Sequence, residues 1–263
     1  MVGADLIRRR ALALFVLLPA YNEAAALPRL LEKFIPLQAR YPKLQVVVVD
    51  DGSADQTAEV AEGFADRLSV TVVRHGRNRG LGCAMNTGLR YVCSHGAAGD
   101  VVVTMDADDT HDPGHIPEML EKIDRGADVV IASRYQQGGE QVGLSPLRRI
   151  LSWGASTLLG WIFGIDGVRD YSSGYRAYRI GALQRAFDRF GENFIEASGF
   201  QCMAEILLKM RMLNLRFGEV PLVLRYDRKA GQSKMPVLET VLQYFFLARK
   251  VSRLEILHEE RLG

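Results

Sequence analysis

The sequence predicts an α/β fold in which helices flank a mostly parallel central sheet. Short apolar runs alternate with helical stretches through the first half of the 263-residue chain. The runs lack the polar alternation of half-exposed strands, so they suit strands that are buried on both faces. Polar clusters follow several of the runs directly, which is typical of the carboxyl edge of a parallel sheet.

The first half of the chain is expected to fold as consecutive βαβ units. The expected strands are 11–18, 45–49, 69–73, 101–105 and 128–132. The helices expected between them are about 24–39, 54–66, 81–95 and 114–125.

The second half begins with a glycine-rich loop at 138–143 and has a mixed rhythm. We expect helices at about 146–163, 181–189 and 199–212, and strands near 174–179 and at 217–225. Without an internal repeat or a proline-rich linker, residues 1–235 are predicted to form one domain. Segment 236–263 has large apolar residues followed by basic ones. It is predicted to be an amphipathic helix that either docks on a membrane surface or packs on the domain.

Composition limits the partners that the chain can take. Its 33 basic and 31 acidic residues give a net charge of +2, which is too small to hold a nucleic acid by a global field. The three cysteines contain no CxxC pair, so neither a disulfide framework nor a zinc cluster is expected, and a reducing compartment fits. No run of eighteen uncharged apolar residues occurs, which predicts a cytoplasmic protein that meets a membrane only at its surface.

Four polar clusters follow expected strands and should share one edge of the sheet. They are Pro19–Glu23, Asp50–Ser53, Asp106–Asp109 and Ser133–Tyr135. No nucleophile elbow and no HExxH pattern occurs, which excludes hydrolytic triads and zinc proteases.

The third cluster suits a divalent cation. Asp106, Asp108 and Asp109 place three carboxylates at the end of one buried strand, where their mutual repulsion is costly unless a cation neutralises it. Mg²⁺ or Mn²⁺ takes one or two carboxylates together with substrate phosphate oxygens, so Asp106 and Asp108 are the predicted ligands. Thr110 or His111 would complete the shell. The alternative is that Asp109 and Asp112 only cap the helix entered at Pro113, which we expect of Asp112.

The first two clusters suit a nucleoside. Asp51 would accept hydrogen bonds from a base N–H or a ribose hydroxyl, while Tyr21 and Glu23 would complete the pocket by stacking and ribose contact. Ser53 and Asp55 are expected to serve only in a turn or helix cap.

Two further segments contain glycines and cations, and each can be interpreted either as a phosphate-binding loop or as an ordinary structural or surface feature. Residues 77–82 open a helix whose free N–H groups would face a phosphate, but tight turning explains Gly80 and Gly82 at least as well. The loop 228–234 suits folding over phosphates, although its cations would also suit a solvated surface. The other scattered cations are Arg134, Arg148, Arg149 and Arg176. Together the clusters indicate metal-assisted handling of a nucleoside diphosphate.

Taken together, these segments resemble family two glycosyltransferases of GT-A fold, and most closely the dolichyl- or polyprenyl-phosphate mannose synthases. The likeness covers nearly the whole chain. The residues that carry it are Pro19–Glu23, Asp50–Ser53, Asn78–Gly82, Asp106–Asp108, His111, Ser133–Tyr135, Ser173–Arg176 and Arg228–Lys234. The resemblance implies a Rossmann-like central sheet, with 1–235 as the catalytic domain.

The resemblance also implies roles for particular residues. The nucleoside of GDP-mannose would be held by Pro19, Tyr21, Glu23, Val49 and Asp51, beside Ala107. Asp106 and Asp108 would bind the metal, and Thr110 stands where an archaeal-type member has a metal-binding glutamine. Arg134, Arg148 and Ser152 would face the lipid phosphate, and Arg228 with Lys234 the donor diphosphate. Asp106, Asp108, Arg134, Arg148 and Lys234 would then carry catalysis.

The expected reaction is inverting transfer of mannose from GDP-mannose to a polyprenyl phosphate, at a membrane surface. A phosphate monoester is largely a dianion at neutral pH and needs no protein base, which fits the lack of an obvious one. A UDP-sugar donor such as UDP-glucose remains an alternative. A second alternative, from another class, is a non-catalytic subunit that binds nucleotide sugars. A homo-oligomer or a separate membrane-anchoring subunit also stays open.

Overall fold

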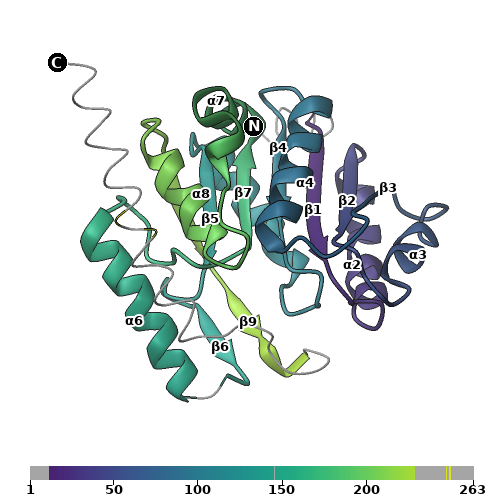
Figure 1. Ribbon diagram of the computed structural model, residues 1–263, viewed down its shortest axis with the longest axis horizontal. Helices are drawn as coiled ribbons and strands as arrows, with labels where there is room; N and C mark the ends of the chain where they lie inside the picture. Colours follow the sequence, from purple (N-terminus) through teal and green to yellow (C-terminus); the bar gives the residue numbers. More distant parts are fainter. Residues whose placement is uncertain (1–11, 145, 229–246, 248, 250–263) are drawn as a thin grey trace.

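A computed structural model describes residues 12–144, 146–228, 247 and 249 (Figure 1). Its described part contains a seven-stranded sheet with the strand order β3-β2-β1-β4-β7-β5-β8. The strands of this sheet are β1 Leu14–Ala20, β2 Leu44–Asp50, β3 Val70–Arg74, β4 Val101–Thr104, β5 Val129–Ser133, β7 Arg176–Arg179 and β8 Phe217–Pro221. β7 runs antiparallel to β4 and β5, and the other pairs are parallel. The predicted mostly parallel sheet is therefore confirmed.

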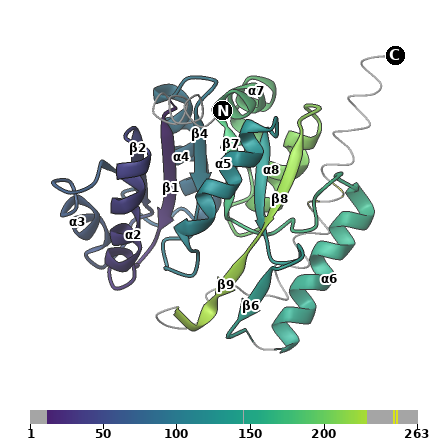
Figure 2. The same cartoon turned by 180° about the vertical axis from the view of Figure 1, so that it is seen from behind.

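Helices cover both faces of the sheet (Figures 1 and 2). α4, α7 and α8 pack in one apolar core, and α2 and α5 pack in the other. The bounds are α2 Leu27–Arg40, α3 Thr57–Glu62, α4 Leu81–His95, α5 Ile116–Asp124, α6 Pro146–Phe163, α7 Ile180–Phe190 and α8 Cys202–Arg211. Valines and leucines fill the sheet between the two layers, as the continuous apolar runs predict.

The strand expected at 217–225 is in fact two strands. β8 ends at Pro221, which has no N–H for a further ladder bond. Leu222 then donates its N–H to the carbonyl of Ser133 (2.9 Å) and accepts from Glu140 (2.9 Å), so the chain changes partner there. Beyond it, β9 (Val223–Arg225) pairs in parallel with β6 (Glu140–Val142) as a separate two-stranded sheet.

The predicted C-terminal helix over 236–263 lies outside the described residues, apart from Leu247 and Arg249. Leu247 is buried in the core and Arg249 is exposed. The division of the chain at 235 stays a prediction. Among the described residues, no helix combines the length and the apolar character needed to cross a membrane.

Candidate active site

The carboxyl ends of β1, β2, β4 and β5 lie at one edge of the sheet, as predicted. Hydrogen bonds join the loops that follow the first two strands. Asn22 donates its N–H to Oγ of Ser53 (2.9 Å), and Ala54 donates its N–H to Oδ1 of Asn22 (2.8 Å). Ser53 and Asp55 thus serve local structure, with Asp55 accepting the N–H of Thr57 (3.1 Å).

Asp51, which follows β2, accepts hydrogen bonds from the loop before α4. Its buried carboxylate accepts N–H groups from Arg79 (3.0 Å) and Gly80 (2.8 Å), and lies 2.6 Å from Nδ1 of His75. Nε2 of His75 lies 3.0 Å from Oγ1 of Thr87. Asp51 therefore holds the loop before α4, and its predicted contact with a nucleoside stays a prediction. The contact between His75 and Asp51 could not be predicted from the sequence, because only the folded chain brings the two side chains together.

The glycine turn at the start of α4 is structural. Gly82 donates its N–H to the carbonyl of Ser198 (2.8 Å), and a Cβ at Gly82 would lie 1.7 Å from the carbonyl oxygen of Ala197. Gly80 has a φ of +90°, which favours glycine, and its N–H is used by Asp51. These two N–H groups bind the chain itself, which supports the tight-turn interpretation of Gly80 and Gly82.

The other predicted nucleoside residues differ in exposure. Tyr21 is exposed just beyond β1, and the N–H of Glu23 is held by Oγ1 of Thr57 (2.8 Å). Pro19 is half-buried and pairs in register with Val49. Val49 has no exposed surface and packs in the core, and its predicted contact with the nucleoside stays a prediction.

The Asp106–Asp108 pair lies just beyond β4 with different surroundings for each carboxylate. The side chain of Asp106 is 45% exposed, and its N–H donates to Nδ1 of His111 (3.1 Å). Asp108 is buried and accepts both the hydroxyl (2.6 Å) and the N–H (3.2 Å) of Thr110. Ala107, between them, is buried. One carboxylate is therefore half-exposed, with Nε2 of His111 at 3.8 Å from its Oδ2, and the other is buried and held by Thr110.

These residues fit a hard divalent cation that takes part of its shell from substrate. Two carboxylates are the donor set that Mg²⁺ or Mn²⁺ uses beside phosphate oxygens. Gly174 leaves room at the site, because a Cβ there would lie 3.2 Å from Oδ1 of Asp106. No group of three or more His, Cys, Asp or Glu side chains in the described part is arranged to hold a metal alone. The hydroxyl of Thr110 orients Asp108, and its predicted role as a ligand stays a prediction.

The third carboxylate of the cluster does not crowd the other two, contrary to expectation. Asp109 has a φ of +63° and pairs with Lys33 and Arg29 of α2, with Nε of Arg29 at 3.5 Å. Its charge is thus compensated away from the site. Asp112 accepts the N–H of Gly114 (2.9 Å), which confirms it as a cap.

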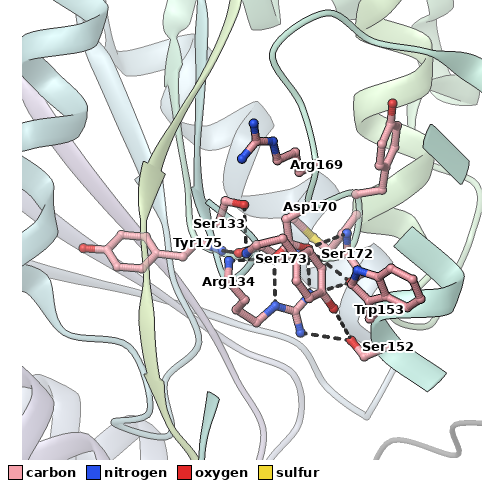
Figure 3. A network of polar contacts seen from close by, with 12 residues as sticks. Ser133, Arg134, Ser152, Trp153, Arg169, Asp170, Ser172, Ser173 and Tyr175 are labelled. Carbon is pink, nitrogen blue, oxygen red and sulfur yellow. Dashed lines mark hydrogen bonds and ion pairs between the residues drawn. The ribbon is translucent and has the colours of Figure 1, made fainter. Parts of the chain in front are cut away.

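Arg134 makes a buried ion pair with Asp170 (Figure 3). Nε and Nη2 of Arg134 donate to the two carboxylate oxygens of Asp170 at 2.7 and 2.6 Å. Burial opposes the charged form of both groups, but their attraction and hydrogen bonds outweigh it. The pKa of Arg134 is therefore raised and the pKa of Asp170 is lowered. Nη1 also reaches Oγ of Ser152 (3.3 Å). Arg134 is thus already paired with a carboxylate, and its predicted contact with the lipid phosphate stays a prediction.

Sequence reasoning missed Asp170 and the loop that it holds. Oε1 of Glu219 accepts the N–H groups of Arg169 (2.7 Å) and Asp170 (2.9 Å), which fixes the entry to this loop. Burial raises the pKa of Glu219. The available signal was the polar stretch 169–174 before an expected strand, because a buried arginine needs a carboxylate partner.

The remaining cations are less informative about the site. Arg176 is fully buried and donates to the carbonyls of Met203 (2.6 Å) and Tyr171 (2.8 Å), so its role is structural. Arg149 donates to the carbonyl of Gln141. The side chains of Arg148 and Arg228, and all of Lys234, lie outside the described part of the chain, and their roles stay predictions.

Comparison with known proteins identifies the family. Residues 15–187 match the family model for glycosyl transferase family 2. The chain belongs to glycosyl transferase family 2. This glycosyltransferase is 36% identical over 220 residues to the undecaprenyl-phosphate mannosyltransferase of Micrococcus luteus, covering 83% of this chain and 86% of that protein. It is 34% identical over 224 residues to the polyprenol monophosphomannose synthase of Mycolicibacterium smegmatis, covering 84% and 80%.

A third relative is longer, and solved structures show the fold. The chain is 32% identical over 231 residues to the dolichol-phosphate mannosyltransferase of Pyrococcus furiosus, covering 87% of this chain and 60% of that protein. The glucosyl-3-phosphoglycerate synthase of Mycobacterium tuberculosis superposes with a TM-score of 0.68 at 20% identity, covering 95% of this chain and 84% of that one. At this identity the likeness confirms the GT-A-like fold of the glycosyltransferase.

Proposed function

We propose that this glycosyltransferase moves mannose from GDP-mannose to a polyprenyl phosphate, with Mg²⁺ or Mn²⁺ at the Asp106–Asp108 pair. The observation that carries the proposal is the match to three relatives whose names all specify mannosyl transfer to prenyl-type phosphates or its product. Each match covers more than four fifths of the chain. A structure of the fold neighbour was solved with Mn²⁺ and UDP, which supports a metal and a nucleotide in this fold.

The chemistry needs a bound nucleophile rather than a protein base. A phosphate monoester is mostly dianionic at neutral pH, because its second pKa is near 6. One of its oxygens attacks the anomeric carbon and forms the new C–O bond. The bond from that carbon to the diphosphate breaks on the opposite side, and its electron pair leaves with the nucleoside diphosphate. Transfer therefore inverts the anomeric configuration.

The described residues contribute by binding and orientation. Asp108 is held by Thr110, and Asp106 presents a half-exposed carboxylate beside it. A divalent ion bound there would supply positive charge that stabilises the diphosphate leaving group. Arg228 and Lys234, whose side chains lie outside the described part of the chain, are proposed to bind the same diphosphate. The hydrogen bond from the N–H of Gly80 to Asp51 holds the loop before α4 in place beside the proposed nucleoside pocket.

A lipid acceptor requires contact with a membrane, and α6 offers a suitable surface. The side chains of Ile150, Trp153 and Trp161 are 64%, 57% and 85% exposed. No acidic residue lies between Pro146 and Phe163, and tryptophan is enriched at the lipid–water boundary. We therefore place the membrane-facing surface on α6, which also carries Ser152, and segment 236–263 is proposed as a second contact. The proposed location is the cytoplasmic face of a membrane.

The proposal is tested with the purified full chain, polyprenyl phosphate in detergent, and GDP-mannose or UDP-glucose, with and without Mn²⁺. We expect a mannosyl phospholipid from GDP-mannose, only when the metal is present. Faster transfer from UDP-glucose would favour the glucosyl alternative. Nucleotide binding with no turnover of either donor would favour a non-catalytic subunit.

A further inference from the structure

A buried ion pair in α8 contacts the segment that precedes this helix. The side chains of Glu205 and Lys209 are each 1% exposed, and Nζ of Lys209 lies 2.7 Å from Oε1 of Glu205. The other carboxylate oxygen, Oε2 of Glu205, accepts the N–H groups of Glu196 (2.9 Å) and Ala197 (2.9 Å). Lys209 also donates to the carbonyl of Asn193 and to Oε2 of Glu196 (3.0 Å). The pair therefore binds the segment through its backbone.

The same segment continues onto the first turn of α4, which lies on the same face of the sheet as α8 (Figure 1). The carbonyl of Ser198 accepts the N–H of Gly82 (2.8 Å). A Cβ at Gly80 would lie 2.6 Å from that same carbonyl oxygen, and a Cβ at Gly82 would lie 1.7 Å from the carbonyl oxygen of Ala197. The N–H of Gly80 is in turn held by Asp51 (2.8 Å). The ion pair is thereby linked through this segment to the predicted nucleoside side of the site, at Asp51.

The start of α8 lies beside the predicted metal side of the site, at Asp106. Nη1 of Arg176, in β7, donates to the carbonyl of Met203 (2.6 Å), and β7 pairs with β4, which ends two residues before Asp106. Burial raises the pKa of the Cys202 thiol, and the nearby carboxylates of Glu205 and Asp106 raise it further. The segment before α8 thus runs from the nucleoside side to the metal side.

We propose that Glu205 is a positioning residue for the nucleotide donor, because it fixes the segment before α8 and thereby the spacing between Asp51 and the Asp106–Asp108 pair. Lys209 neutralises Glu205 in the core and leaves its Oε2 to the backbone of the segment. A bound nucleoside diphosphate has to contact both places at once, so a change in their spacing weakens its binding although no contact residue is altered. This inference rests on the proposed function, in which the nucleotide spans these two places.

A role confined to stability makes a different prediction. A buried ion pair gives little stability over packed apolar side chains of similar size, whereas removing one partner alone is costly. If the pair only stabilises the fold, its loss lowers the thermal midpoint while the folded enzyme keeps its affinity for GDP. Positioning predicts that a stable variant without the backbone bonds loses affinity for GDP and keeps its affinity for the acceptor.

The experiment compares two double variants of the full chain, Glu205→Leu/Lys209→Met and Glu205→Gln/Lys209→Met. Both remove the two charges, and they differ in whether the side chain at position 205 can accept the backbone N–H groups. Glu205→Gln alone is a third variant, and Ile206→Val is the matched control, because Ile206 is buried in the same helix and its side chain makes no hydrogen bond. Calorimetry gives the Kd of GDP with Mn²⁺ and the thermal midpoint, and kinetics gives the KM for farnesyl phosphate, an acceptor that needs no membrane.

We expect Glu205→Leu/Lys209→Met to raise the Kd of GDP about tenfold, the effect of about one hydrogen bond to a charged group. Glu205→Gln/Lys209→Met should bind GDP within about threefold of the wild type, because the amide oxygen can accept both backbone N–H groups. Glu205→Gln alone should resemble the leucine variant, since its NH₂ meets either the ammonium of Lys209 or the backbone donors. The KM for farnesyl phosphate should stay within about twofold throughout, and Ile206→Val should change only the thermal midpoint.

An unchanged Kd of GDP in both Glu205→Leu/Lys209→Met and Glu205→Gln would overturn the inference, whatever happens to the thermal midpoint. An equal rise in the Kd of GDP for Ile206→Val, or an equal rise in the acceptor KM, would also overturn it. If only one of the two variants folds, as judged by circular dichroism, that variant decides. Failure of both to fold would assign the pair to stability alone and overturn the positioning role.

The wild-type enzyme separates this failure from that of the proposed function. If the wild type binds GDP and the folded variants bind it equally well, only the inference fails. If the wild type binds UDP in place of GDP, the proposed donor is wrong, and the same variants are compared with UDP. If the wild type binds neither nucleotide in the presence of Mn²⁺, both the inference and the proposed function fail.

Discussion

Replacing Gly82 with alanine tests how the start of α4 is held. An added Cβ would lie 1.7 Å from the carbonyl oxygen of Ala197 and 3.2 Å from Cα of Ser198, and backbone atoms cannot rotate away. Overpacking of this kind costs about 1–3 kcal/mol. The shift also breaks the Gly82–Ser198 hydrogen bond (2.8 Å), which contributes about 1 kcal/mol. Alanine regains up to about 1 kcal/mol of helix propensity. The net loss expected in the free energy of unfolding is therefore about 2 kcal/mol.

Gly154 in α6 provides the matched control, because a Cβ there meets no atom within 4 Å. Gly154→Ala should stabilise the protein by about 0.5–1 kcal/mol through helix propensity alone. Urea unfolding is followed by far-UV circular dichroism, since both tryptophans lie on α6 and would report that helix locally. The two alanine variants should shift the midpoint in opposite directions with equal slopes.

If the free energy of unfolding of Gly82→Ala lay within about 0.5 kcal/mol of the wild-type value, the reasoning would be refuted. A loop packed against Gly82 cannot accommodate the added Cβ without a loss of stability. It would mean that residues 196–198 do not rest on α4. The structural interpretation of the glycine turn would then fail, and the phosphate-binding interpretation would return.

Three further predictions concern the metal, pH and the membrane. Asp108→Ala and Asp106→Asn should each abolish Mn²⁺-dependent binding of GDP in calorimetry, and unchanged affinity in both would remove the metal assignment. The lowered pKa of Asp170 stabilises the fold above the unfolded value of about 3.9 and ceases to do so as pH falls through the folded value. The difference in unfolding free energy between wild type and Asp170→Asn should therefore shrink in acid, and a gap that widens would contradict the ion pair. Replacing Trp153 and Trp161 together by serine should release the protein from anionic liposomes in flotation, while undiminished binding would assign the membrane contact elsewhere.

The sequence predicts the sheet well where burial alone decides the structure. β1, β2 and β4 are buried on both faces, so their apolar runs are continuous and their ends are marked by polar clusters. Asp106 and Asp108 follow from the same rule, because they come directly after β4. The split at Pro221 was not predictable, since it depends on a change of hydrogen-bond partner that only the assembled sheet shows.

Other features of the site depend on contacts between distant segments. Asp109 turns toward α2 because its backbone adopts a positive φ and two cations of that helix compensate its charge. Asp170 lies 36 residues from Arg134 along the chain, and only the antiparallel return of β7 beside β5 brings the two together. Neither the ion pairs of Asp109 with α2 nor the ion pair of Asp170 with Arg134 can be predicted from periodicity or local motifs.

The most direct test of the central claim, transfer to a phosphate on a polyprenyl chain, is an acceptor competition. The wild-type enzyme receives GDP-mannose, Mn²⁺, and equal amounts of polyprenyl phosphate, the corresponding polyprenol and 3-phosphoglycerate, and mass spectrometry counts the mannosylated products. We predict mannosyl phosphopolyprenol as the only product. Mannose on the free alcohol or on phosphoglycerate would contradict the account.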